Sequence, residues 1–129
     1  MLKSFIYLSI FMSFSYANSI IWVKTYQEAI NLSIKENKRV MLFITKPSCV
    51  WCKKMKRLTF TDNKVIKEVN ANYISIELSK NSNEIPSNFL VKRVPTTQFI
   101  SKNGTLVKKV AGYWNAEDFL SWLSDVKKL

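Results

Sequence analysis

Apolar and polar residues are grouped along the chain in a pattern that predicts a strand between two helices. Residues 40–44 form a continuous apolar run, which is typical of a strand buried on both faces of a sheet. Before this run, Thr25 and Glu28 have the spacing of a capping box, which predicts a helix from about 26 to 36. After it, helical character resumes at about Cys49 and continues through Leu58.

The second part of the chain predicts three more strands and a terminal helix. In order, the expected elements are a short helix across Val65 and Ile66 capped by Asp62, a strand at 73–77, a turn or short helix near Phe89, strands at 96–100 and 105–110, and a helix capped by Asn115. Asn103 and Gly104 tolerate positive φ and predict a hairpin turn between the last two strands. This order predicts an α/β fold with a central mixed β-sheet flanked by helices on both faces.

The last helix carries a stripe of apolar residues at helical spacing. Its members are Phe119, Leu120, Trp122, Leu123 and Val126. Such a stripe is typical of a helix face packed on a core, so we interpret these residues as core rather than as a cofactor site.

Residues 1–17 differ from the rest of the chain and predict a secretory signal peptide. Lys3 supplies a positive start, residues 4–14 are uncharged and largely apolar, and Ser15 and Ala17 place small residues at the −3 and −1 positions of a cleavage site. An uncleaved membrane anchor is the alternative, because the charge-free stretch is about long enough to span a bilayer. Either way we expect the domain at 18–129 to leave the cytoplasm, and in a Gram-negative bacterium to lie in the periplasm.

Composition and charge narrow the chemistry that the chain can perform. Its 129 residues, 47% of them hydrophobic, suit one folded domain. The net charge is +11 but the basic residues are scattered, which favours a solvated lysine-rich surface over an acidic partner, a membrane surface or, least of all, nucleic acid. The sequence contains no His, which excludes Cys–His and Ser–His nucleophile pairs and the usual mixed-ligand zinc sites. We expect no cofactor and no metal.

The two cysteines, Cys49 and Cys52, are spaced as Cys-x-x-Cys at the predicted start of a helix that follows a buried strand. Free backbone N–H groups and the positive end of the helix dipole favour a thiolate on the first cysteine. Nearby lysines favour it further; they are Lys46, Lys53, Lys54 and Lys56. We therefore predict that Cys49 is the attacking nucleophile and Cys52 the resolving thiol in disulfide exchange.

Two other interpretations of the cysteine pair are open but weaker. A purely structural disulfide would constrain little of the unfolded chain, because the loop that it closes is so short. Half of a zinc site completed by a second chain would have only two soft ligands from this one.

The motif Cys-x-Trp-Cys-Lys-x-Met resembles the active site of exported thioredoxin-like proteins within the thioredoxin superfamily. It is formed here by Cys49, Trp51, Cys52, Lys53 and Met55, and the likeness extends from about Trp22 to Leu129. The resemblance implies a thioredoxin-like fold with a redox-active disulfide between Cys49 and Cys52. Trp51 could shield the disulfide or contact substrate, and it could equally be a packed aromatic residue.

Val94-Pro95-Thr96 is the second mark of that family. In the family, a cis-proline at this position faces the cysteine pair and exposes backbone groups to an extended substrate peptide. The resemblance therefore implies that Trp51, Val94 and Pro95 bind substrate. An ordinary trans-proline that begins a strand is the alternative.

The chain departs from thioredoxin at positions that bear on its chemistry. The Cys-Gly-Pro-Cys of thioredoxin is absent, and Val94 before Pro95 does not set the direction of electron flow. Thioredoxin carries a buried acid where this chain has Phe43, so proton handling at Cys52 must differ. Glu77 on the neighbouring strand is an alternative acid, although we favour a solvated strand end as its role.

These features predict an exported thiol–disulfide oxidoreductase that exchanges disulfides with exported proteins, with reductase as the leading hypothesis. It would need a membrane electron donor or acceptor, because cytoplasmic reductants do not reach that compartment directly. A disulfide oxidase or isomerase is the runner-up, since a stabilised thiolate makes a disulfide more oxidising. A non-catalytic peptide-binding module that uses the groove at Pro95 is the third alternative. We expect a monomer, because no dimerisation segment is present.

Overall fold

Five strands form one mixed sheet in the spatial order β1-β3-β2-β4-β5. The computed structural model describes residues 17–129, so of the predicted signal peptide all but Ala17 lies outside the described residues. The strands are β1 (Trp22–Val23), β2 (Arg39–Thr45), β3 (Tyr73–Ser79), β4 (Thr96–Ile100) and β5 (Leu106–Ala111). β1 and β2 run parallel to β3, β4 runs antiparallel to β2, and β5 runs antiparallel to β4. The predicted α/β class with a mixed sheet is confirmed.

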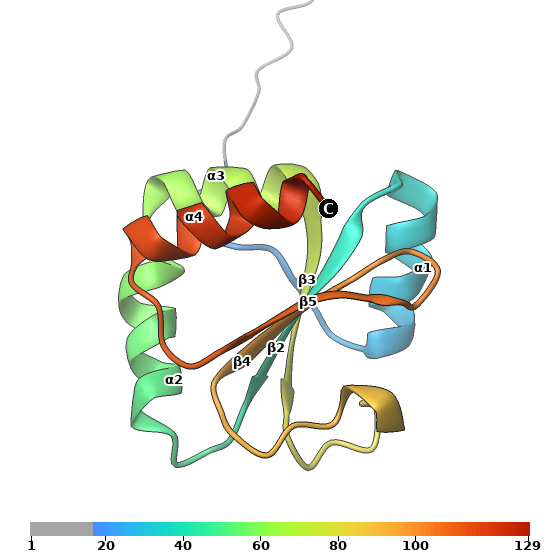
Figure 1. Ribbon diagram of the computed structural model, residues 1–129, viewed down its shortest axis with the longest axis horizontal. Coiled ribbons are helices and arrows are strands. Elements are labelled where there is room, and N and C mark those ends of the chain that lie inside the picture. Colours follow the sequence, from blue (N-terminus) through green and yellow to red (C-terminus); the bar gives the residue numbers. More distant parts are fainter. Residues whose placement is uncertain (1–16) are drawn as a thin grey trace, which may run out of the picture.

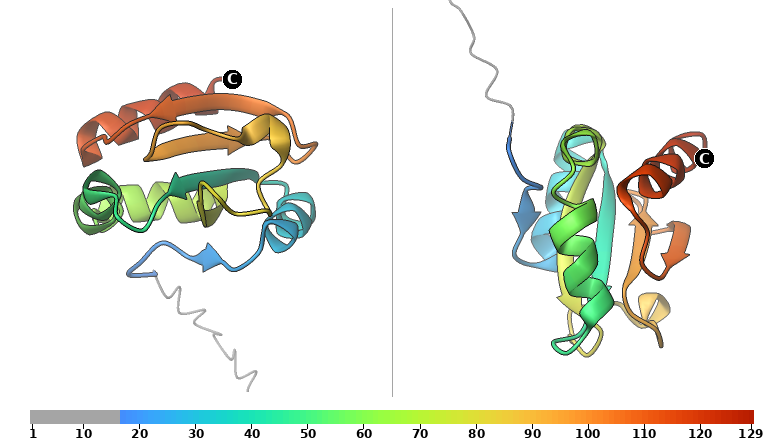
Figure 2. Two further views of the ribbon diagram at one scale, coloured as in Figure 1. Left: turned by 90° about the horizontal axis from the view of Figure 1, so that it is seen from below. Right: turned by 90° about the vertical axis from the view of Figure 1, so that its left-hand side faces the viewer.

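Helices cover both faces of this sheet, as Figures 1 and 2 show. They are α1 (Tyr26–Glu36), α2 (Val50–Lys54), a π-helical turn (Met55–Thr59), α3 (Asn63–Asn72), a short 3₁₀ turn (Ser87–Phe89) and α4 (Ala116–Lys127). The helix that we predicted from Cys49 through Leu58 is therefore α2 continued by the π-helical turn.

β2 explains how two layers of helices share one sheet. Its side chains point alternately to the two faces. Met41 and Phe43 pack in one core with α3, α4 and β5, while Leu42 and Ile44 pack in a second core with α1 and the 3₁₀ turn. Both faces are thus covered, which accounts for the continuous apolar run at 40–44. Of the predicted core stripe on α4, three side chains are buried and two are partly buried; these are Phe119, Leu123 and Val126, and Leu120 and Trp122.

Polar side chains fix where the helices begin. Thr25 accepts the Glu28 N–H at 3.1 Å, and the Glu28 carboxylate reaches back to the Lys24 N–H at 3.2 Å, one residue earlier than in a standard capping box. Asp62 accepts the N–H groups of the second and third residues of α3 at 3.0 and 3.1 Å. Asn115 caps α4 as expected, accepting the Asp118 N–H at 2.9 Å.

Four details differ from the sequence-based expectation. β1 was not predicted, because two residues carry no readable period. α3 runs for ten residues and is longer than the short helix expected across Val65 and Ile66. In the β4–β5 hairpin only Gly104 has positive φ, at 80°, and Asn103 does not, so the loop is longer than a two-residue turn. β3 is buried almost throughout although its sequence alternates, because Ser75 faces the core with 1% of its surface exposed.

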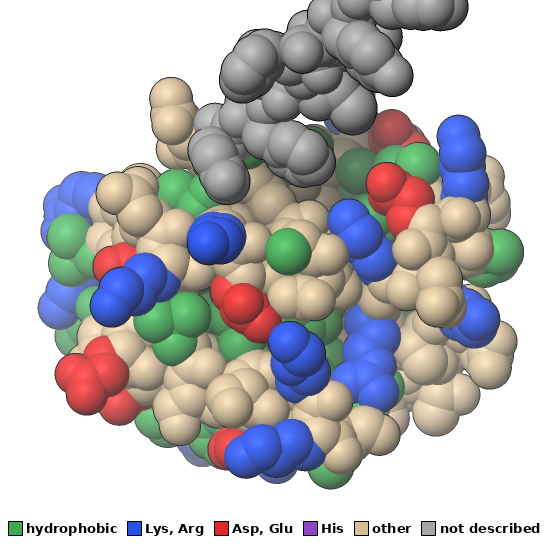
Figure 3. All heavy atoms as spheres, turned by 90° about the horizontal axis from the view of Figure 1, so that it is seen from above, with side chains coloured by type: hydrophobic (Ala, Val, Ile, Leu, Met, Phe, Trp, Pro, Cys, Tyr) green, Lys and Arg blue, Asp and Glu red, His purple; other side chains and the backbone are tan. Residues whose placement is uncertain are grey.

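The N-terminal strand is attached to the end of the molecule where α3 lies. The Asn70 side chain accepts the Ile21 N–H at 3.0 Å and donates to the Ser19 carbonyl at 2.9 Å. On the face seen from above, over α3 and α4, acidic and basic side chains are interspersed (Figure 3). None of the helices within residues 17–129 combines the length and apolar content needed to cross a membrane.

Removing the cap of α3 tests how much local polar bonding contributes to stability. We expect Asp62→Ala to lower the free energy of unfolding by about 1 kcal/mol, because two helix N–H groups lose their acceptor. Urea denaturation would show a lower midpoint at an unchanged slope. Asn63→Ala is the control, since this exposed residue gives no cap bond. Equal losses in the two variants would contradict the prediction.

Candidate active site

The two cysteines lie at the end of β2, where the chain turns into α2. Cys49 is the N-cap residue of α2, and Cys52 lies in the first turn of that helix. They form a disulfide with their Cα atoms 5.2 Å apart, and Cys49 Sγ accepts the Cys52 N–H at 3.1 Å. Cys49 has 5% of its surface exposed and Cys52 2%. The helical turn thus holds the two sulfur atoms at bonding distance, and both cysteines are buried.

An aromatic pair beside the disulfide holds a lysine. Trp51 is 54% exposed, and its ring lies 5.5 Å from that of Tyr113, which follows β5. The Nζ atom of Lys54 is 4.9 Å from the Trp51 ring centroid and 5.0 Å from that of Tyr113. The charge of Lys54 therefore faces two π surfaces, which attract cations. Trp51 is in this way both exposed and packed, and the two sequence-based interpretations of it are compatible.

An open groove of about 300 Å³ lies next to the cysteine pair. It is lined by Trp51, Val94, Pro95, Gly112 and Tyr113. The Val94–Pro95 peptide bond is cis, and the Pro95 carbonyl accepts the Gly112 N–H at 2.8 Å. Gly112 has a φ of 88°, a conformation that favours glycine. The structure thus brings together the three residues predicted to bind substrate, from segments more than forty positions apart in the sequence.

A second cavity, of about 200 Å³, lies on the other side of Cys52. It is lined by Thr45, Lys46, Pro47, Cys52, Lys53, Lys56, Glu77 and Ser79. The Glu77 carboxylate, 27% exposed, pairs with Lys56 at 3.0 Å and accepts a 3.4 Å hydrogen bond from Thr45. Glu77 is therefore a partly exposed acid that is paired with Lys56 and shares a cavity with Cys52, which fits both roles considered for it.

Glu77 lies on β3 directly opposite Phe43, the position at which thioredoxin carries its buried acid. The sheet register places Phe43 opposite Glu77, and Phe43 itself is fully buried against Phe60, with ring centroids 4.9 Å apart. The carboxylate on the neighbouring strand thus lies beside the position at which thioredoxin has its acid. The pairing with Lys56 was missed from the sequence, because strand register is not visible there; aligning the ends of the two apolar strands is the signal that could have suggested it.

Two tyrosines have a pKa that is shifted by burial. Burial raises the pKa of Tyr73, at the opposite end of β3, to about 12, and burial also raises the pKa of Tyr26. Across the described part of the chain, no three His, Cys, Asp or Glu side chains are grouped to hold a metal ion.

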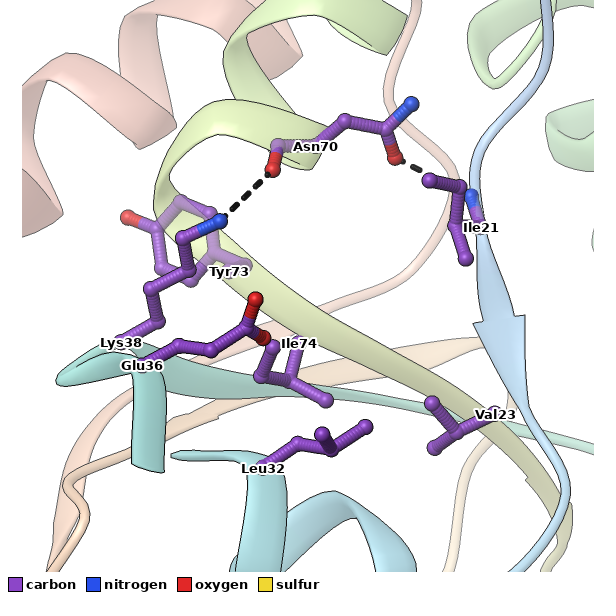
Figure 4. Close-up of a pocket in the computed structure, with 8 residues that line it drawn as sticks. All are labelled: Ile21, Val23, Leu32, Glu36, Lys38, Asn70, Tyr73 and Ile74. Carbon is purple, nitrogen blue, oxygen red and sulfur yellow. Dashed lines mark hydrogen bonds between the residues drawn. The ribbon is translucent and has the colours of Figure 1, made fainter. Parts of the chain in front are cut away.

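Figure 4 shows a further cavity, of about 270 Å³, between β1, β3 and α1. Asn70 spans its rim, accepting the Ile21 N–H on one side and the Lys38 ammonium at 3.3 Å on the other. Neither cysteine lines this cavity, so it is separate from the candidate active site.

Comparisons with known proteins agree with this geometry. Residues 26–127 match the family of the thioredoxin-like domain. The chain is 32% identical over 99 residues to the thiol:disulfide interchange protein DsbD of Haemophilus ducreyi, a match that covers 72% of this chain and 17% of the relative. It therefore spans only a small part of that relative's length.

Two solved structures show the same fold at low identity. The DsbH oxidoreductase superposes with a TM-score of 0.70 at 19% identity, covering 88% of each chain. The C-terminal domain of Neisseria meningitidis DsbD, in its oxidised form, superposes with a TM-score of 0.63 at 21% identity, covering 77% of this chain and 90% of that one. Together with the family match and the bonded cysteine pair, these likenesses confirm the resemblance seen in the sequence. The chain belongs to the thioredoxin-like domain family, and its Cys49–Cys52 pair forms a disulfide.

Proposed function

We propose that the chain is an exported disulfide reductase that acts on proteins through Cys49 and Cys52. Residues 1–17 are its signal peptide, its compartment is the periplasm, and a membrane electron donor returns it to the dithiol form. The observation that carries the proposal is the position of Cys49 at the start of α2, beside an open groove and in front of Cys52.

The cysteine geometry supports a two-step exchange. The Cys49 thiolate attacks one sulfur of a substrate disulfide, and the other substrate sulfur leaves as a thiolate and takes a proton from water. Cys52 then loses its proton and attacks Cys49 Sγ, which releases the second substrate thiolate and closes the Cys49–Cys52 disulfide. Two electrons have passed from the dithiol to the substrate, so the donor must supply two before the next cycle.

The groove beside the disulfide supports Trp51, Val94 and Pro95 as substrate-binding residues. An extended peptide can lie in such an open groove and pair with backbone groups that a strand end exposes. Because the groove borders the turn that carries Cys49, a peptide seated there would bring its disulfide to the sulfur that attacks first.

The reductase direction is supported by the contacts that two lysines near the cysteines already make within the domain. Lys56 is paired with Glu77, and the Lys54 ammonium lies over the rings of Trp51 and Tyr113. Charge that is already paired stabilises a cysteine thiolate less, and a less stabilised thiolate makes the dithiol more reducing. Lys46 and Lys53 form no ion pair within the described residues, and they are the observation that favours an oxidase instead.

The roles of the two cysteines can be separated by substitution. We expect Cys49→Ser to abolish turnover of a disulfide peptide, because it removes the nucleophile. Cys52→Ser should form a mixed disulfide that it cannot resolve, and non-reducing electrophoresis with mass spectrometry would identify the bond at Cys49. Trapping by Cys49→Ser, and none by Cys52→Ser, would reverse the assignment.

The reduction potential of the cysteine pair tests the direction of electron flow. Equilibration with glutathione should give a value near that of thioredoxin, about −270 mV, if the protein is a reductase. A value near that of a strongly oxidising disulfide protein, about −120 mV, would replace the reductase proposal by the oxidase.

The Glu77–Lys56 pair should tune that potential. Glu77→Gln leaves Lys56 unpaired beside Cys52, which favours the thiolate and makes the potential less negative; Lys56→Gln does the opposite. A partly exposed pair is worth about 0.2–1 kcal/mol, which corresponds to a shift on the order of 5–20 mV. Lys64→Gln on α3 is the control, and shifts of the same sign in Glu77→Gln and Lys56→Gln would contradict the prediction.

A further inference from the structure

Acidic and basic residues are unevenly divided along the chain. Neither residues 37–61 nor residues 85–116 contain an Asp or Glu, although the chain has 9 in all. The same two stretches contain more than half of the basic residues, namely Lys38, Arg39, Lys46, Lys53, Lys54, Lys56, Arg57, Lys92, Arg93, Lys102, Lys108 and Lys109. Two long segments of the chain thus carry positively charged side chains and no negatively charged ones.

The fold places part of each segment at the active site, while Lys38, Arg39 and Lys102 lie toward the opposite end of the sheet. The first carries the cysteine pair, and the second carries Pro95 and Tyr113. The face shown in Figure 3, over α3 and α4, carries both basic and acidic side chains. The parts of these segments that lie at the active site thus contribute basic side chains and no acidic ones.

A groove continues this basic surface beyond Pro95. It has a volume of about 350 Å³ and is lined by Leu90, Val91, Lys92, Arg93, Thr96, Lys109 and Ala111. It lies beside the groove next to the cysteines, because Thr96 follows Pro95 and Ala111 precedes Gly112. Leu90 is 56% exposed, so the groove offers apolar surface together with three cationic side chains.

The cationic side chains of this groove are not paired with other residues that the structure describes. Lys92, Arg93 and Lys109 are all exposed, and among the described residues their side chains make no salt bridge and no hydrogen bond to a protein acceptor. By contrast, Lys102 and Lys108, from the same segment, contact Asn37 and the Trp122 ring. Three free cations close together repel one another, and an anionic partner would relieve that repulsion.

We propose that the groove formed by Lys92, Arg93 and Lys109 is a docking site for an acidic segment that flanks the disulfide of a substrate protein. The proposal rests on the function proposed above and names the kind of substrate. A peptide that lies across the Pro95 groove and continues past Thr96 meets these three side chains. Complementary charge raises the rate of association more than the strength of the final complex, so the preference should appear in the second-order rate of reaction.

Mixed-disulfide formation by the Cys52→Ser variant measures this preference in one step. Three peptides would share one disulfide ring and carry flanking residues that are acidic, neutral or basic. We expect the acidic peptide to react at least about tenfold faster than the basic one at low ionic strength, with the neutral peptide between them. The difference should shrink as salt is added, because salt screens exposed charges.

Charge reversal locates the effect on the surface. In the Cys52→Ser background, the combined substitutions K92E, R93E and K109E should make the basic peptide react faster than the acidic one. The rate of the neutral peptide should stay within about twofold of its value without them. The matched control adds K64E, K67E and K127E, which change the net charge equally on α3 and α4; it should keep the original order.

The outcomes distinguish this proposal from the function on which it rests. Equal rates for all three peptides at low salt would overturn the acidic-segment proposal and leave the exchange activity standing. No mixed disulfide with any peptide would instead remove the proposed function. Equal peptide rates, together with binding to phosphatidylglycerol vesicles that the groove variant loses and the control keeps, would overturn the proposal and assign the surface to a membrane.

Discussion

The burial of β2 on both faces is the constraint on which the rest of the structure depends. Five consecutive apolar residues can all be removed from water only at the centre of a sheet that helices cover on each side. Once β2 is central, β3 and β4 must pair with its two edges, and the loop after Thr45 must emerge between them. The disulfide, the turn at Pro95 and the carboxylate of Glu77 meet because they all lie at that end of β2 and its neighbours.

The sequence predicted the parts of the fold that depend on local pattern. The strands at 40–44 and 96–100 and the helices after Thr25 and Asn115 follow from apolar runs and cap residues, and the structure has each of them within about two residues. The cysteine pair at the start of a helix was equally visible, because the motif and the preceding strand are adjacent in the chain. Local signals of this kind need no knowledge of what packs against them.

What the sequence could not supply depends on contacts between distant segments. β1 is a strand only because Trp22 and Val23 find an open edge of β3. The contact of Trp51 with Tyr113, and that of Lys56 with Glu77, depend on how α2 is rotated over the sheet and on strand register. Glu77 shows the consequence most clearly, since an acid near a strand end reads as solvated until a lysine from another element is placed beside it.

Asn70 attaches residues 19–21 to α3 and so fixes the end of the domain at which the described chain begins. The described part of the chain thus begins beside α3, whereas Cys49 lies at the start of α2, beyond the far end of β2. The surface at which the domain begins and the surface that carries the grooves beside the cysteines therefore lie at opposite ends, so contacts made at one do not compete for space with contacts made at the other.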